Sequence, residues 1–169
     1  VGTAAVGAEE VVGALHHQDL EDAEAKVLGR QTALARIDKW KGKGLRIGFT
    51  NGCFDLLHPG HVSLLAQAKA ACDRLVLGLN SDASVSRLKG PTRPLQTEAA
   101  RATVLASLAS VDLVIIYPDD TPLPLITEIR PDVLVKGADW ALEDVIGAKE
   151  VQASGGRVVL VDLEPGHST

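Results

Sequence analysis

Short apolar runs alternate with longer segments of helical period through most of the chain. The runs are rich in Val, Ile and Leu, which is typical of strands buried on both faces of a parallel sheet. Five such strands are predicted, at residues 45–50, 75–79, 113–117, 133–136 and 157–161. Apolar residues at helical spacing predict helices between them, at residues 62–71, 98–108, 122–129 and 148–153. The pattern therefore predicts a Rossmann-like, three-layer α/β/α domain around a five-stranded parallel sheet.

The first 44 residues follow a different pattern. Two charge-rich helices are predicted, at residues 8–17 and 20–39, and they end at Lys41-Gly42-Lys43-Gly44, a composition typical of flexible linkers. Residues 19–44 are therefore expected to form a helical linker that precedes one compact domain at residues 45–169. The length of 169 residues and the 46% hydrophobic content fit that single domain.

Composition and charge exclude several classes of protein. The formal net charge of −5 argues against a surface that follows nucleic acid, so any phosphate site must be local. No apolar run approaches the roughly 18 to 20 residues that span a bilayer, and the N-terminus lacks a signal-peptide pattern. The two cysteines, Cys53 and Cys72, cannot build a disulfide framework, which favours the cytoplasm. Met is absent even from position 1, which predicts a piece of a longer product.

The most informative segment joins the first predicted strand to the next helix, and reads Thr50-Asn51-Gly52-Cys53-Phe54-Asp55-Leu56-Leu57-His58-Pro59-Gly60-His61. Open parallel sheets bind ligands beyond the carboxyl ends of their strands, where a helix start directs free N–H groups at anions. Pro59 suits a first helical turn. Because His58 and His61 are three residues apart, both can reach one phosphate chain, and Gly52 and Gly60 allow the backbone to approach it.

Other interpretations of this segment remain open. A pair of histidines at this spacing is commonly a surface or packing feature. The residue types of Asp55, His58 and His61 also suit a metal site. Cys53 is a weaker candidate for a nucleophile, since the spacing indicates no partner base, and a small packed thiol fits it better.

The segment resembles the signature of the nucleotidyltransferase superfamily, whose members carry a His-x-Gly-His motif after the first strand. His58, Gly60 and His61 match that motif. The resemblance implies a nucleotidyltransferase fold in which the two histidines are catalytic: they bind the triphosphate and stabilise charge on the α-phosphate during in-line attack. Such a transfer needs positioning and charge neutralisation more than covalent catalysis. The other nucleotide-binding residues implied here are Thr50, Asn51, Gly52, Phe54, Asp55 and Gly60.

A basic stretch at residues 87–94, Arg-Leu-Lys-Gly-Pro-Thr-Arg-Pro, is the second candidate. Its charge alone favours a solvated surface loop. Together with the preceding Asn80-Ser81-Asp82, however, it is similar to a loop of bacterial ADP-heptose synthases. The resemblance implies a catalytic role for Lys89 and substrate-phosphate contacts for Arg93 and Asn80. Arg101 matches a helical Arg of related cytidylyltransferases and is expected either to bind substrate phosphate or to be a solvated helix residue.

Two further segments extend the resemblance. In Lys136-Gly137-Ala138-Asp139-Trp140, after the fourth predicted strand, it implies that Lys136, Gly137 and Asp139 bind the nucleotide, while Trp140 packs against the site or in the core. In Gly166-His167-Ser168-Thr169, it implies that Ser168 and Thr169 begin a helix that touches the triphosphate.

From about Arg46 to Thr169 the chain resembles an ADP-heptose synthase domain. The resemblance implies transfer of AMP from ATP to D-glycero-β-D-manno-heptose 1-phosphate, giving ADP-heptose for lipopolysaccharide core synthesis and pyrophosphate. Mg²⁺ is expected with ATP, and no metal held by the protein alone. The expected partners are ATP and heptose 1-phosphate, without nucleic acid or membrane, and a homo-oligomer is left open. Residues 1–18 resemble the end of a sugar-kinase domain that is fused ahead of this domain in bifunctional proteins, although kinase activity is not expected of this chain.

Two alternative functions remain. A protein similar to glycerol-3-phosphate cytidylyltransferases would share the first motif and the Gly-Ala-Asp-Trp segment, and would prefer CTP. A non-catalytic nucleotide-binding module would be expected to lack His58, His61 or the basic stretch, and this chain has all three.

Overall fold

The computed structural model describes residues 7–162, which fold around one five-stranded parallel sheet. The strands follow the order β3-β2-β1-β4-β5. Their bounds are β1 (Ile47–Gly52), β2 (Arg74–Asn80), β3 (Leu113–Tyr117), β4 (Val133–Gly137) and β5 (Arg157–Val161). This arrangement confirms the predicted fold class, and every strand lies within two residues of its predicted bounds.

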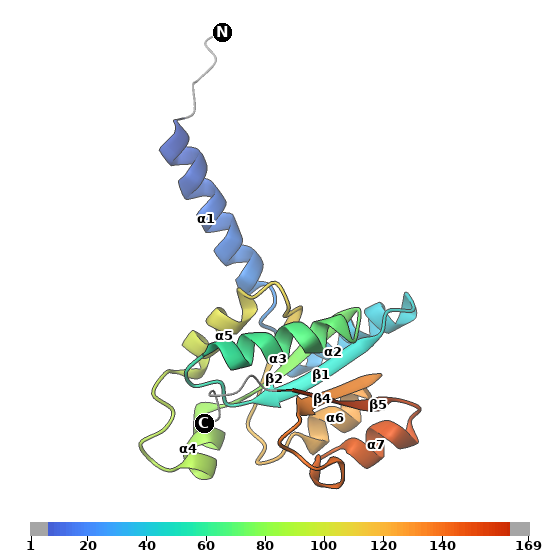
Figure 1. The fold of residues 1–169 in the computed structure, drawn as a ribbon. Helices are drawn as coiled ribbons and strands as arrows, with labels where there is room; N and C mark the ends of the chain where they lie inside the picture. Colours follow the sequence, from blue (N-terminus) through green and yellow to red (C-terminus); the bar gives the residue numbers. More distant parts are fainter. Residues whose placement is uncertain (1–6, 163–169) are drawn as a thin grey trace.

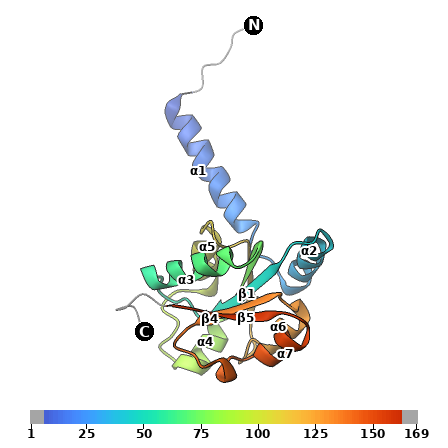
Figure 2. The same ribbon diagram turned by 45° about the vertical axis from the view of Figure 1, so that its right-hand side comes forward.

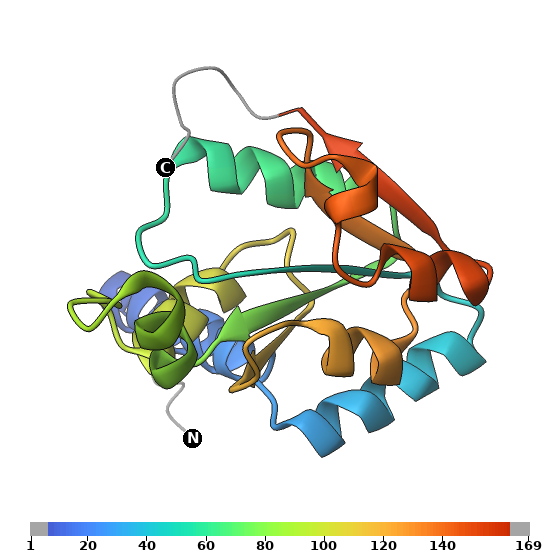
Figure 3. The same cartoon turned by 90° about the horizontal axis from the view of Figure 1, so that it is seen from below.

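Helices cover both faces of the sheet (Figure 3). They are α1 (Ala8–Glu24), α2 (Arg30–Gly42), α3 (Pro59–Ala70), α4 (Asp82–Lys89), α5 (Glu98–Ala106), α6 (Leu123–Ile129) and α7 (Ala148–Ala153), with a short 3₁₀ turn, η1 (Leu142–Asp144). Helices α3 and α5 pack on one face, whereas α2, α6 and α7 pack on the other. Because each strand alternates its side chains between these faces, the core has two halves separated by the sheet.

The N-terminal segment differs from the expected linker. The structure replaces the predicted break near residue 18 with one continuous helix, α1, which projects away from the sheet (Figures 1 and 2). Helix α2 buries Ala33 and Ile37 fully against the sheet. Its last turn is also fixed, because the Lys41 ammonium donates to the backbone carbonyls of Ile129 and Arg130 at the end of α6. The latter part of residues 19–44 therefore belongs to the packed domain.

Residues 26–28 extend this packing to the edge of the sheet. Val27 forms a parallel bridge with Val114 of β3, and the Leu28 N–H donates to the Val114 carbonyl at 3.1 Å. The Val114 N–H in turn donates to the Lys26 carbonyl at 2.8 Å. The backbone groups of the outer strand β3 are thus partly satisfied by chain that precedes the first strand.

Helix α4, like the short turn η1, was not predicted from the sequence pattern. It follows β2 directly, and the Ser81 hydroxyl caps it by accepting from the Ser84 N–H. Only Ser84 and Val85 of this helix are buried, so it has no repeating apolar stripe. The residues expected to form a basic loop therefore begin on a helix, with Lys89 as its last residue.

The order in which the chain adds strands to the sheet reverses at β1, the central strand. The chain passes from β1 outward to β2 and β3, then returns to pair β4 on the opposite side of β1. The β1–β2 ladder runs from Ile47 to Gly52, but the β1–β4 ladder contains only Gly48 with Val133 and Phe49 with Leu134. Beyond those pairs the two strands lose backbone pairing toward their carboxyl ends, which is the usual place for a ligand in such a sheet.

Candidate active site

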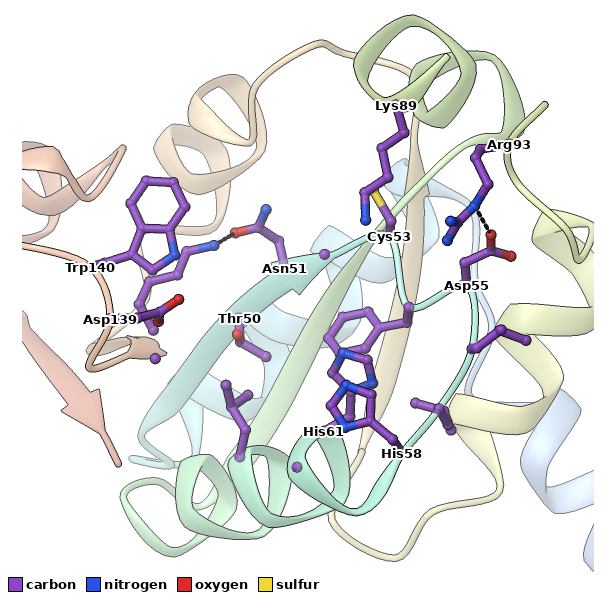
Figure 4. Close-up of a pocket in the computed structure, with 18 residues that line it drawn as sticks. Thr50, Asn51, Cys53, Asp55, His58, His61, Lys89, Arg93, Asp139 and Trp140 are labelled. Atoms are coloured by element: carbon purple, nitrogen blue, oxygen red, sulfur yellow. Dashed lines mark hydrogen bonds and ion pairs between the residues drawn. The ribbon is translucent and has the colours of Figure 1, made fainter. Parts of the chain in front are cut away.

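A pocket of about 520 Å³ lies at the carboxyl ends of β1 and β4 (Figure 4). Its lining comes from the segment after β1, the start of α3, the end of α4 with the loop that follows, and the loop after β4. The lining residues are Thr50, Asn51, Gly52, Cys53, Phe54, Asp55, Leu56, Leu57, His58, Gly60, His61, Leu64, Lys89, Arg93, Lys136, Gly137, Asp139 and Trp140. Three candidate segments far apart in the sequence therefore meet in one place.

The first turn of α3 presents the two histidines to this pocket. His58 is the N-cap residue, Pro59 is the first helical residue, and His61 follows in the first turn. The two imidazoles stack with their centroids 3.7 Å apart, and the ring of Phe54 meets His61 edge-on at 5.2 Å. The helix start and both rings thus point toward the same space, as the three-residue spacing predicts (Figure 4).

The conformation of Phe54 explains the glycine that precedes it by two residues. Phe54 has a φ of 44°, an uncommon left-handed conformation for a residue with a large side chain. Its ring lies over Gly52, where a Cβ atom would come within 2.9 Å of the ring. The missing side chain at Gly52 therefore makes room for Phe54, and the expected approach of phosphate to its backbone stays a prediction.

His61 is neutral at pH 7 in this environment. Burial, reinforced by the neighbouring His58 and Lys89, lowers the pKa of His61 to about 4. A neutral imidazole can donate one hydrogen bond to an anion. An incoming triphosphate would oppose the causes of the low pKa, since negative charge favours the protonated ring.

Asp55 anchors the loop that follows α4. Its carboxylate, only 2% exposed, accepts hydrogen bonds from Arg93 Nε at 2.7 Å, from the Leu95 N–H at 2.8 Å and from the Gln96 N–H at 3.0 Å. Burial alone would raise the pKa of Asp55, but these donors outweigh it and lower the pKa. In this structure the carboxylate is thus engaged by the loop after α4, although Asp55 lines the pocket, and its expected contact with nucleotide stays a prediction.

The cations of the basic stretch take different directions. Arg87 turns away from the pocket and bonds Asp120 at 2.8 Å and the Pro118 carbonyl at 2.6 Å. Lys89 points into the pocket from the end of α4, opposite the histidines (Figure 4), and makes no hydrogen bond or ion pair with residues 7–162. Arg93 uses Nε for Asp55, and the remainder of its partly exposed guanidinium lies at the pocket wall.

The loop after β4 brings a second lysine to the other side of the pocket. Lys136 donates to Asn51 Oδ1 at 2.6 Å, which connects β4 to β1 where their backbones no longer pair. Burial lowers the pKa of Lys136 to about 8, against the opposing charge of Asp139. The Trp140 ring, 46% exposed, lies 6.0 Å from the Lys136 ammonium, so Trp140 is at the pocket rim and not in the core.

Two residues expected to bind substrate phosphate are instead part of the interior. Arg101 is 1% exposed and donates to the carbonyls of Cys53, Asn80 and Gln96 and to Asp82. Asn80 is 4% exposed, and its amide bonds Tyr117 and Ser84. With these donors and acceptors satisfied inside the protein, both residues support the pocket from behind.

The alternative chemistries for this segment are not favoured. Burial raises the pKa of the Cys53 thiol, which opposes formation of a nucleophilic thiolate and agrees with a packed cysteine. Between residues 7 and 162, no three His, Cys, Asp or Glu side chains are grouped so as to hold a metal ion. Nor does any helix in that range have the length and apolar character needed to cross a membrane.

The structure gathers most of the residues singled out from the sequence and adds a few. The exceptions are Asn80 and Arg101, which are buried, and Ser168 and Thr169, which lie outside the described residues. Leu56, Leu57 and Leu64 were not predicted to line the pocket, because isolated leucines carry no functional signal in a sequence. Tyr117 was missed as well, since its contacts with Asn51 and Asn80 join separate strands.

The chain is similar in sequence and in fold to known proteins. The chain is 62% identical over its whole length to the Bifunctional protein HldE of Paramagnetospirillum magneticum and, likewise, to that of Rhodospirillum rubrum. It spans only 35% and 34% of the length of these two relatives. The crystal structure of a lipopolysaccharide core biosynthesis protein from Thermoplasma volcanium matches with a TM-score of 0.58 at 26% identity, covering 72% of this chain and 98% of that one.

A more distant structure has the same fold. The pantoate–β-alanine ligase of Francisella tularensis matches with a TM-score of 0.54 at 18% identity, covering 76% of this chain and 64% of that one. The cytidylyltransferase-like family model matches residues 49–163, which include most of β1, the two histidines and the other lining segments of the pocket. The chain belongs to the cytidylyltransferase-like family.

Proposed function

We propose that this domain transfers AMP from ATP to D-glycero-β-D-manno-heptose 1-phosphate, giving ADP-heptose and pyrophosphate. The observation that carries the proposal is the convergence of two imidazoles and two lysine ammonium groups on one pocket at the switch point of the sheet. The high identity to the HldE proteins and the match to a lipopolysaccharide core biosynthesis protein support the choice of substrate.

The proposed reaction is an in-line displacement at the α-phosphate. A phosphate oxygen of the sugar phosphate forms a bond to that phosphorus, and the bond to the bridging oxygen breaks, so that pyrophosphate leaves. His58 and His61 donate to the phosphate oxygens from the start of α3, and Lys89 stabilises the developing charge from the opposite wall. No residue needs to form a covalent bond to substrate.

Lys136 and the loop after β4 are proposed to hold the nucleotide. Lys136 binds a phosphate oxygen, Gly137 allows close approach, and Asp139 contacts ribose or base. On the other wall, the free edge of Arg93 binds the phosphate of the sugar. Thr50, Asn51 and Gly60 complete the nucleotide side of the pocket.

Mg²⁺ is proposed to enter with ATP. Such an ion keeps several waters and binds mainly through phosphate oxygens and one or two carboxylates. Asp139 is exposed at the pocket, whereas the carboxylate of Asp55 is occupied by the loop after α4. The donor set fits an ion carried by the triphosphate, and its chemistry is to neutralise phosphate charge.

In the longer relatives a second activity accompanies this domain, as their name, bifunctional protein, indicates. We propose that this second activity is that of a sugar kinase and that residues 1–18 belong to the end of its domain. Synthesis of the heptose phosphate and its activation would then occur on one polypeptide.

A screen of pyrophosphate release tests the proposal. ATP and CTP, each with Mg²⁺, are offered with heptose 1-phosphate, other sugar phosphates and glycerol 3-phosphate. The expected result is release with ATP and heptose 1-phosphate. Release with CTP and glycerol 3-phosphate would instead assign the cytidylyl transfer that the family name suggests. Binding of nucleotide without any release would indicate a non-catalytic module.

A further inference from the structure

A continuous chain of hydrogen bonds crosses the sheet behind the pocket. Lys136 Nζ donates to Asn51 Oδ1 at 2.6 Å, and Asn51 Nδ2 donates to the Tyr117 hydroxyl at 3.2 Å. That hydroxyl donates to Asn80 Oδ1 at 3.0 Å, and Asn80 Nδ2 donates to the Ser84 hydroxyl at 3.0 Å. The Ser84 hydroxyl donates to the Asp119 carbonyl at 3.1 Å, the last hydrogen bond of the series. Its members come from four strands, from α4 and from the loop after β3.

The two ends of the chain fix the direction of every bond between them. A lysine ammonium can only donate, and a backbone carbonyl can only accept. The Asn51 amide must therefore turn its oxygen to Lys136 and its nitrogen to Tyr117, and the Asn80 amide must turn its oxygen to Tyr117. The Tyr117 hydroxyl accepts from Asn51 and donates to Asn80, so it holds the Asn51 amide in the orientation that turns its oxygen to Lys136.

A glycine allows Tyr117 to reach that position. Tyr117 belongs to β3, and its ring must pass over β2 to contact Asn51 on β1. Gly78 of β2 is paired with Asn51, and a Cβ atom there would come within 3.2 Å of the Tyr117 ring and 2.8 Å of Phe49. Tyr117 is itself 1% exposed, and burial raises its pKa to about 12, so the hydroxyl stays protonated and able to donate.

The chain matters most where the sheet opens. Between β1 and β4 the backbone ladder ends at Phe49 and Leu134, so the bond from Lys136 to Asn51 spans strands that are no longer paired. We propose that Tyr117 is a positioning residue: by orienting Asn51, it holds the Lys136 ammonium at the wall of the pocket for a nucleotide phosphate. The phosphate role of Lys136 rests on the proposed function, whereas its dependence on Tyr117 does not.

The test compares Tyr117→Phe with Ser84→Ala. Tyr117→Phe removes only the oxygen that orients Asn51, so the fold is expected to persist. Ser84→Ala removes another buried hydroxyl from the same chain but keeps the bonds among Tyr117, Asn51 and Lys136, which makes it the matched control. The lysine side-chain carbons are followed by NMR from pH 6 to 11, with Lys136 assigned from a Lys136→Arg variant, and thermal unfolding verifies that each variant is folded.

In Tyr117→Phe the pKa of Lys136 is expected to fall by about 0.5, because Asn51 is no longer held in place to accept from the buried ammonium. No such fall is expected in Ser84→Ala. An unchanged Lys136 titration in Tyr117→Phe overturns the proposal. So does an equal fall in both variants, since that indicates general loosening.

Catalysis gives a separate readout. The KM for ATP is expected to rise about fivefold in Tyr117→Phe with kcat nearly unchanged, the loss of roughly one hydrogen bond to bound nucleotide. A fall in kcat with unchanged KM contradicts the positioning role. A parent protein that releases no pyrophosphate contradicts the proposed function alone, because the titration requires neither substrate nor turnover.

Discussion

Replacing Arg101 with methionine removes four hydrogen bonds from the interior while keeping a side chain of similar length. The bond to the Asn80 carbonyl is fully buried, so its loss costs about 1 to 3 kcal/mol. The carbonyls of Cys53 and Gln96 are partly buried and can gain water, at about 0.5 to 1.5 kcal/mol each. Asp82, 43% exposed, returns to solvent at little cost. The free energy of unfolding of the variant should therefore be about 3 kcal/mol lower than that of the parent.

Urea unfolding followed by circular dichroism measures this difference, provided that the free energy of unfolding decreases with urea concentration at the same slope in both proteins. Arg46→Met is the matched control, since Arg46 pairs with Asp73 at the surface, 58% exposed, and its loss should barely change the midpoint. The reasoning would be refuted if the unfolding midpoint of Arg101→Met were as close to that of the parent as the midpoint of Arg46→Met is. Arg101 would then be a solvated helix residue, the alternative that the sequence leaves open.

Three further outcomes are expected. His61→Ala, and to a lesser degree His58→Ala, should lower the rate of pyrophosphate release on the order of 100-fold with an unchanged circular dichroism spectrum, and parental rates in both would contradict their catalytic role. The free energy of unfolding should decrease as the pH falls from 6.5 to about 4, because His61 stays neutral in the folded protein but is protonated in the unfolded one. A His61→Gln variant should show a smaller decrease over that range. An equal decrease in both proteins would argue against the low pKa of His61. Lys89→Ala should weaken ATP binding about tenfold, as measured by calorimetry. Arg87→Ala removes a cation that is directed at Asp120 and should leave ATP binding unchanged. Equal effects of the two substitutions would show that only net charge matters.

Much of the fold is predictable because the strands are marked by their own residues. Runs such as Leu113–Tyr117 are apolar at every position, and they form strands buried on both faces. Helix α4 escaped prediction because its only buried residues are Ser84 and Val85, so its stability comes from the Ser81 cap and from packing that no local pattern reveals.

The candidate site was predicted where function follows from local spacing, and less well where it depends on distant partners. His58 and His61 act from a single helical turn, which the sequence displays directly. Asp55 is held by residues 38 to 41 positions away, so nothing near it indicates that its carboxylate is occupied. Arg101 did carry a usable signal: it lies four residues before Leu105, on the buried side of α5, where an arginine must find internal acceptors.

The match to the family model begins at residue 49, yet a protein shortened to start there would have lost α2 and the residues that bond β3. Ile37 and Ala33 cover one apolar face of the sheet, and residues 26–28 protect its outer edge. An uncovered face beside an unprotected strand edge favours association with other copies. For recombinant expression, the domain should accordingly begin before Lys26, and shorter versions are expected to collect in the insoluble fraction although their catalytic residues are intact.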